Sequence, residues 1–139
     1  MAKLICIDPG HGGESSPGAV YGGLQEKDAT LQIGRMVARN LREVGFDVIM
    51  TRDSDEDISL PRRCDIANDA GADAFVSIHL NAAKNRTAHG AETWKWPKNT
   101  SSLAKDVQTE LIAATGAKNR GAKSSKTFYV LKHTLASAL

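Results

Sequence analysis

The sequence is poor in cysteine and in long apolar runs, and each shortage excludes a class of protein. Its two cysteines, Cys6 and Cys64, are too few for a disulfide framework, and both lie in apolar or helical patterns. We therefore expect buried thiols rather than a bridge. No stretch approaches the ~20 apolar residues that a membrane-spanning helix needs, so no membrane insertion is expected.

The sequence also lacks a large excess of charge of either sign. The net charge is only +2, and the basic residues form no continuous block, which gives no support for nucleic-acid binding. The first residues lack the basic leader, apolar stretch and small-residue cleavage site of a secretion signal. We expect either a chain made without such a signal or a domain cut from a longer precursor.

The 139 residues fit one domain in which strands and helices alternate. This alternation predicts an α/β fold with a mainly parallel central sheet and helices on both faces. Apolar runs and periodicity place strands at 3–8, 46–51, 74–79, 90–96 and 127–131, and helices at 27–44, 59–70 and 101–115.

Reactive side chains gather where the predicted strands end. His11 follows the first strand inside a glycine-rich loop at 9–24, and His79 ends the third strand. Glu26 lies at the start of the first helix, which must return from the same edge of the sheet. Two imidazoles and one carboxylate are a known zinc-binding set that leaves a fourth position open.

The same residues have more ordinary explanations. Histidines at strand ends are often hydrogen-bonded loop positions, and Glu26 could simply favour a helix N-terminus. Asp8, at the end of the first strand, could orient a ligating histidine or form part of a turn before Pro9.

Short motifs spread along the chain resemble those of the zinc-dependent N-acetylmuramoyl-L-alanine amidases of bacterial autolysins and phage endolysins. They are Ile7-Asp8-Pro9-Gly10-His11-Gly12-Gly13, Glu26-Lys27-Asp28, Thr51-Arg52, Leu60 with Arg63, Ala67-Asn68, Ala72-Asp73-Ala74-Phe75-Val76-Ser77-Ile78-His79-Leu80-Asn81-Ala82, Gly90-Ala91-Glu92-Thr93 and Asn119-Arg120-Gly121-Ala122-Lys123. Each string is weak alone, but their common order over nearly the whole chain is specific.

The resemblance implies that His11, Glu26 and His79 bind Zn²⁺ in an amidase catalytic domain spanning residues 1–139, with a phosphorylase/hydrolase-like α/β fold. It implies hydrolysis of the amide between the lactyl group of N-acetylmuramic acid and L-alanine in peptidoglycan. We expect a monomer that acts on the cell wall, either released by cell lysis or excised from an exported precursor.

The sequence departs from the family pattern at the general base. In the family a Glu is expected on a final strand, and residues 135–139 resemble only the approach to that strand, with Ser137 where proline is usual. We interpret the domain as cut short there, with the final strand missing and the expected Glu beyond Leu139. Otherwise another acid serves, and Glu92 is the best candidate, although a structural carboxylate that accepts hydrogen bonds near the site is the more ordinary role for it.

Three further residues are candidates for binding the substrate. Asn81 could position it or cap a loop, and Arg120 and Lys123 could bind peptide carboxylates or belong to a solvated basic loop. Because the expected Glu is absent, a wall-binding or regulatory module that keeps the metal site without turnover is a second hypothesis. A zinc peptidase acting on short peptides is a third.

Overall fold

The structure, a computed structural model, describes residues 2–83, 85 and 87–139. Its strands are β1 (Leu4–Pro9), β2 (Val20–Tyr21), β3 (Leu24–Gln25), β4 (Asp47–Met50), β5 (Ala74–Ile78), β6 (Ala91–Lys95), β7 (Asn119–Ser124) and β8 (Ser137–Ala138). Its helices are α1 (Glu26–Glu43), α2 (Leu60–Asp69), α3 (Leu103–Thr115) and α4 (Tyr129–His133). No helix among the described residues is long and apolar enough to cross a membrane.

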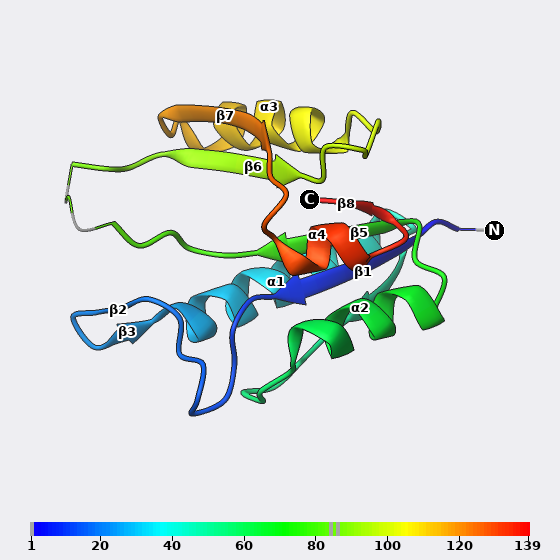
Figure 1. The fold of residues 1–139 in the computed structure, drawn as a ribbon, viewed down its shortest axis with the longest axis horizontal. Helices are drawn as coiled ribbons and strands as arrows, with labels where there is room; N and C mark the ends of the chain where they lie inside the picture. The colour runs from blue at the N-terminus through cyan, green and yellow to red at the C-terminus, as the bar shows by residue number, and fades with distance from the viewer. Residues whose placement is uncertain (1, 84, 86) are drawn as a thin grey trace.

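A four-stranded sheet in the order β4-β1-β5-β8 forms the centre of the fold, and every pairing in it is parallel (Figure 1). β1 and β5 run side by side, with Pro9 paired to Ile78 at their carboxyl ends. The α/β class and the mainly parallel sheet are thereby confirmed. The parallel register also brings the loops that follow β1 and β5 to one edge.

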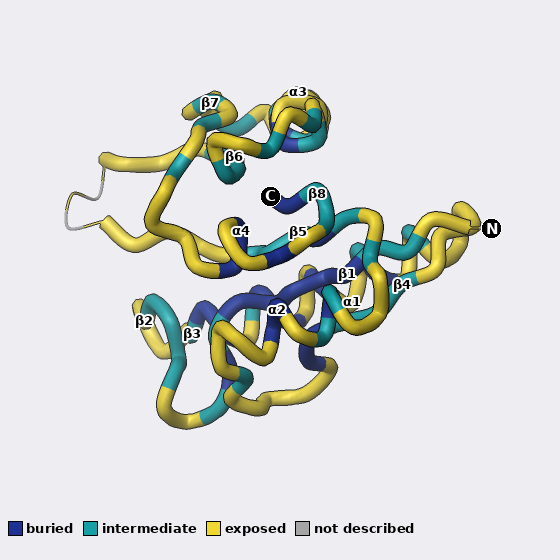
Figure 2. Tube along the Cα trace, turned by 45° about the vertical axis from the view of Figure 1, so that its right-hand side comes forward, coloured by how far each residue is buried: buried dark blue, intermediate teal, exposed yellow. Residues whose placement is uncertain are grey.

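Helices cover both faces of this sheet, as predicted. Successive side chains of β1 point to opposite faces, so both faces carry side chains that the helices bury. Cys6 and Phe75 pack on one face with Cys64 of α2 and Val130 of α4 in the main buried core. Figure 2 shows much of β1 as a buried stretch of the chain at the centre of the fold. On the other face α1 approaches so closely that a Cβ at Gly34 would lie 2.8 Å from Pro9 Cγ. Both cysteines are buried and free, as expected.

The second helix illustrates how local sequence defines an element. Ser59 precedes α2, and its hydroxyl accepts a hydrogen bond from the Arg62 amide, while Pro61 occupies the first turn. A serine cap followed by proline is a typical helix start. The serine hydroxyl accepts a hydrogen bond from a backbone N–H that has no partner within the helix, and proline has no N–H to leave unpaired there. This predicted start is confirmed.

The strand predicted at 127–131 is wrong. The chain forms the short helix α4 there, which turns the adjacent apolar residues Val130 and Leu131 into the core against α2. The strand lies earlier, at β7, and pairs in parallel with β6 in a separate two-stranded sheet covered by α3. A short apolar run does not distinguish a buried strand from a helical turn.

The end of the chain also differs from expectation. The segment interpreted only as the approach to a missing strand contains β8, whose Ser137 and Ala138 pair with Ala74 and Phe75 of β5. Leu139 continues the ladder, since its amide donates to Phe75 O at 3.0 Å. The central sheet thus has a fourth strand within the described residues.

Candidate metal centre

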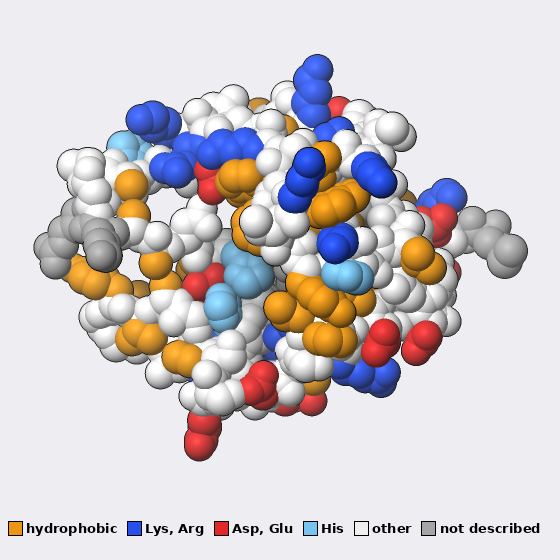
Figure 3. All heavy atoms as spheres, in the orientation of Figure 1, with side chains coloured by type: hydrophobic (Ala, Val, Ile, Leu, Met, Phe, Trp, Pro, Cys, Tyr) orange, Lys and Arg blue, Asp and Glu red, His pale blue; other side chains and the backbone are white. Residues whose placement is uncertain are grey.

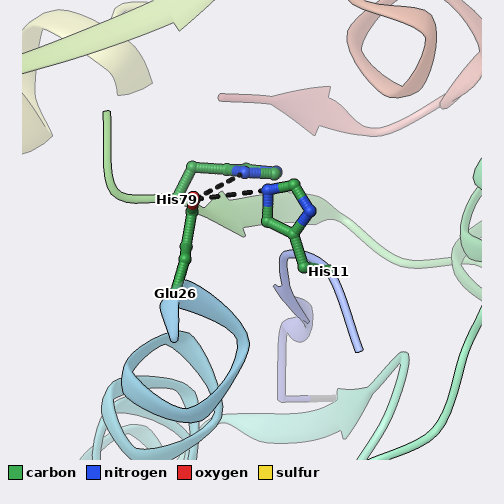
Figure 4. A group of neighbouring side chains, drawn as sticks. All are labelled: His11, Glu26 and His79. Carbon is green, nitrogen blue, oxygen red and sulfur yellow. Dashed lines mark hydrogen bonds and ion pairs between the residues drawn. The ribbon is translucent and has the colours of Figure 1, made fainter. Parts of the chain in front are cut away.

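Three elements deliver the candidate ligands to one edge of the central sheet. His11 lies two residues beyond β1, His79 directly follows β5, and Glu26 is the first residue of α1. The amide of Gly10 donates to Ile78 O at 2.9 Å, which ties the two strand ends together just before the histidines. Figure 4 shows both imidazole rings facing the same oxygen of Glu26.

The ligand atoms lie close enough to share one ion. Glu26 Oε1 is 3.4 Å from His11 Nε2 and 3.2 Å from His79 Nδ1. All three ligand atoms lie within 4.8 Å of one another, and the two rings meet edge to face with centroids 4.9 Å apart. Ligands about 2.0–2.1 Å from a tetrahedral zinc ion are separated from one another by about 3.3 Å, which the two carboxylate–imidazole distances match.

Hydrogen bonds fix the carboxylate and one of the rings. Glu26 is almost fully buried, and its two oxygens accept hydrogen bonds from the amides of Leu80 (2.7 Å) and Ala19 (2.9 Å). His11 Nδ1 lies 3.2 Å from Ser16 Oγ. A neutral His11 that donates to this hydroxyl turns the lone pair of Nε2 toward Glu26, as a metal ligand requires.

Two glycines provide the space that these side chains occupy. A Cβ at Gly10 would lie 2.4 Å from His79 Cε1, and one at Gly18 would lie 2.7 Å from His11 Cδ2. His11 itself has φ 61°, and it is the one non-glycine among the described residues with a positive φ. The glycine-rich loop therefore bends so that the imidazoles pack against its backbone.

Electrostatics and exposure suit a metal ligand at this edge. Burial is the main cause that lowers the pKa of His11, partly opposed by the Glu26 carboxylate, so the ring is neutral near pH 7. Metal binding requires that neutral form. The His79 side chain is 48% exposed, and Figure 3 shows histidine side chains at the surface near the middle of this face. The site is thus open to solvent on one side.

Asp8 takes neither of the two roles considered for it. Its carboxylate lies 2.7 Å from Nη1 of the buried Arg63 and accepts hydrogen bonds from Thr51 Oγ1 (2.6 Å) and Ser77 Oγ (2.7 Å). It is a buried ion-pair partner beneath the His11 loop.

The other predicted site residues meet in a second cluster, centred on Glu92. Its carboxylate accepts hydrogen bonds from Asn81 Nδ2 (2.9 Å), Trp94 Nε1 (3.2 Å) and Arg120 Nε (3.0 Å), and it pairs with Lys123. Arg120 and Lys123 are three residues apart on β7 and would point to opposite faces of a regular strand. The irregular register of the β6–β7 pair, with φ 88° at Gly121, lets both reach one carboxylate.

This environment does not favour Glu92 as the general base. The hydrogen bond from Lys123, with further ones from Arg120 and Trp94, lowers the pKa of Glu92 to about 2. An efficient general base has a pKa close to the working pH. The contacts instead support the alternative, a structural carboxylate that ties β6 and β7 to Asn81, two residues beyond His79.

Replacing Glu92 with glutamine tests that structural role through pH. A carboxyl group whose pKa is lowered by folding stabilises the protein above its unfolded pKa, and this contribution is lost as the pH falls toward the folded pKa. The melting temperature of Glu92→Gln should therefore be below that of the wild type above pH 4.5, with the gap closing between pH 4.5 and about 2. Thermal melts across this range, with Glu110→Gln at an exposed position of α3 as control, measure it; equal melting temperatures at pH 7 would contradict it.

Two buried arginines near the site had no role assigned from sequence. Arg52 directly follows Thr51 at the carboxyl end of β4, and Arg63 lies in α2; both donate to carbonyl groups of the loop that carries His11. The available signal was position, since Arg52 lies two residues beyond the carboxyl end of β4, at the edge where the histidines lie. Charged residues are rarely fully buried, so the sequence favoured exposed positions for both arginines.

Comparison with known proteins places this geometry in context. The family model described as N-acetylmuramoyl-L-alanine amidase matches residues 5–139. The chain is 37% identical over 138 residues to the N-acetylmuramoyl-L-alanine amidase LytC of Bacillus subtilis (strain 168), covering 96% of this chain and 27% of LytC. It is 40% identical over 145 residues to the sporulation-specific N-acetylmuramoyl-L-alanine amidase of the same organism, covering 100% of this chain and 54% of that protein.

A solved structure shows the same fold. The N-acetylmuramoyl-L-alanine amidase from Clostridium difficile 630 superposes with a TM-score of 0.93 at 38% identity, covering 99% of this chain and 76% of that one. The chain thus spans less than two thirds of the two curated relatives named above but about three quarters of this solved chain.

Proposed function

The chain belongs to the N-acetylmuramoyl-L-alanine amidase family, and from this premise we propose that it hydrolyses the amide between the lactyl group of N-acetylmuramic acid and L-alanine in peptidoglycan. The observation that carries the proposal is the convergence of His11, Glu26 and His79 on one solvent-open edge. We propose that these three residues hold Zn²⁺ and that the chain acts as a monomer on the cell wall.

The chain's own groups prepare the site for this reaction. When bound, zinc supplies a Lewis acid and a water whose pKa is lowered to about 7. The Leu80 and Ala19 amides hold the Glu26 carboxylate in place, and Ser16 orients His11, so these two proposed ligands do not have to reorganise. Preorganised ligands of this kind favour tight binding of the metal ion and a fixed orientation of the substrate.

We propose that the Glu92 cluster contacts the peptide side of the substrate. Asn81 follows His79 by two residues, and the Arg120 and Lys123 side chains remain about one third exposed although both pair with Glu92. Two cations shared by one carboxylate leave a local positive charge, which suits the free carboxylates of a stem peptide.

Product analysis tests the proposed reaction. Purified peptidoglycan incubated with the zinc-loaded protein should yield peptides with a free L-alanine amino terminus and glycan that retains its lactyl group, as read by mass spectrometry. Metal-stripped protein is the control. Isolated stem peptides should stay intact, and their cleavage would instead indicate a zinc peptidase.

A wall-binding module without turnover is the second candidate function. The hydrogen bonds that hold Glu92 ionised favour it, because they remove the best described candidate for the base. It predicts that zinc-loaded protein sediments with insoluble wall but releases no new amino termini. Release of L-alanine termini in the same assay excludes it.

A further inference from the structure

Arg52 is a buried cation whose hydrogen bonds go to neutral oxygens. Only 2% of the residue is exposed. Its guanidinium donates to the carbonyls of Pro9 (2.9 Å), Ser54 (3.0 Å), Gly10 (3.0 Å) and Lys27 (2.8 Å), and to Thr30 Oγ1 (3.2 Å). Removing a charged side chain from water without a counter-ion costs free energy. The position of Arg52 therefore needs an explanation beyond packing.

The acceptors belong to the two segments that carry His11 and Glu26. Pro9 and Gly10 lead directly into His11, while Lys27 and Thr30 lie in the first turns of α1, directly after Glu26. A single Nη2 donates to Gly10 O and Lys27 O, and so bridges the loop and the helix. Arg52 therefore links the segment that carries His11 to the helix that begins with Glu26.

Thr30 completes the bridge. Its hydroxyl, fully buried, donates to Gly10 O at 2.7 Å and accepts from Arg52 Nη2. Arg63 differs from Arg52 in its acceptors. It donates to Pro9 O and His11 O, and its other acceptors, Asp8 and Ile58 O, lie outside α1. Arg63 supports the loop, whereas Arg52 joins the loop to the helix.

We propose that Arg52, with Thr30, is a positioning residue that sets the distance between His11 and Glu26 and thereby the affinity for the divalent cation. This inference rests on the proposed metal site. Lysine cannot replace it, because its side chain ends one bond short of the position of Nη2 and its one nitrogen cannot also supply the hydrogen bonds from Nε and Nη1. Outer partners of metal ligands typically change affinity by about 10–100-fold when lost.

Zinc affinity, measured by competition with a chromophoric chelator, tests the inference without relying on activity. Arg52→Lys should bind zinc about 10–100-fold more weakly than the wild type. Thr30→Val, which replaces the hydroxyl with a methyl group, should also weaken zinc binding, and Thr30→Ser, which keeps the hydroxyl, should bind zinc like the wild type. Thr30→Val carries the test if Arg52→Lys does not fold.

Val130→Ala is the matched control for stability alone. Val130 lies in the core between α4 and α2, so its truncation should lower the melting temperature without changing the zinc affinity of the folded protein. Wild-type affinity in both Arg52→Lys and folded Thr30→Val would overturn the inference. A wild type that binds no zinc would overturn the proposed metal site itself, which is a different result.

Discussion

Replacing His79 with alanine should abolish tight zinc binding and leave the protein folded. The ring contributes one of the three proposed ligand atoms, so its loss should weaken zinc binding by more than the roughly 10–100-fold that outer partners contribute. The side chain is about half exposed, and Glu26 keeps the hydrogen bonds from Leu80 and Ala19. Stability should therefore change by only about 0.5 kcal/mol, as for other surface substitutions.

Metal content after dialysis against zinc, measured with thermal melts on the same samples, shows both effects. His133→Ala is the control, because His133 is an exposed histidine of α4 that hydrogen-bonds to Tyr129 O and stacks on its ring. It should bind zinc like the wild type. Normal zinc content in His79→Ala would show that the ligand assignment is wrong.

Replacing Asp8 with asparagine should strongly destabilise the protein. Asp8 and Arg63 form an ion pair in which both side chains are almost fully buried, and asparagine keeps the shape of Asp8 while removing its charge. The Arg63 guanidinium would then be buried without its counter-ion. Breaking a buried pair in this way typically costs about 3–5 kcal/mol, so the free energy of unfolding should fall by that amount.

Urea titrations of Asp8→Asn and Asp53→Asn make the comparison. Asp53 also pairs with an arginine, Arg35, at 2.6 Å, but both side chains are more than half exposed. Solvent screens such a pair, so Asp53→Asn should cost less than about 1 kcal/mol. Equal losses in the two variants would contradict the account of Asp8.

The parts of the fold that the sequence predicted are those in which local pattern and tertiary structure agree. β1 and β5 are short, mostly apolar runs, and they become neighbouring parallel strands of the central sheet. α2 begins at the serine and proline that favour a helix start. Alternation of these elements was enough to place the ends of β1 and β5, and hence both histidines, at one edge.

The parts that were missed depend on contacts between distant segments. β7, Asn119–Ser124, has little apolar pattern of its own and forms a strand by pairing with β6. The apolar residues at 130 and 131 were interpreted as a strand, but they form one turn of helix because α2 offers them a core. No local signal separates these outcomes.

The candidate site divides in the same way. The three proposed ligands were found from chemistry and topology alone, since histidines and a glutamate at strand and helix ends were visible in the sequence. The meeting of Arg120 and Lys123 on Glu92 depends on an irregular strand register, and the bridge made by Arg52 depends on the packing of α1. Neither of these has a sequence pattern.

Zinc K-edge X-ray absorption on the zinc-loaded protein tests the central claim most directly. Two imidazole nitrogens and carboxylate or water oxygen at about 2.0–2.1 Å, at one zinc per chain, are the predicted result. A spectrum without imidazole scattering, or one unchanged in His79→Ala, would contradict it.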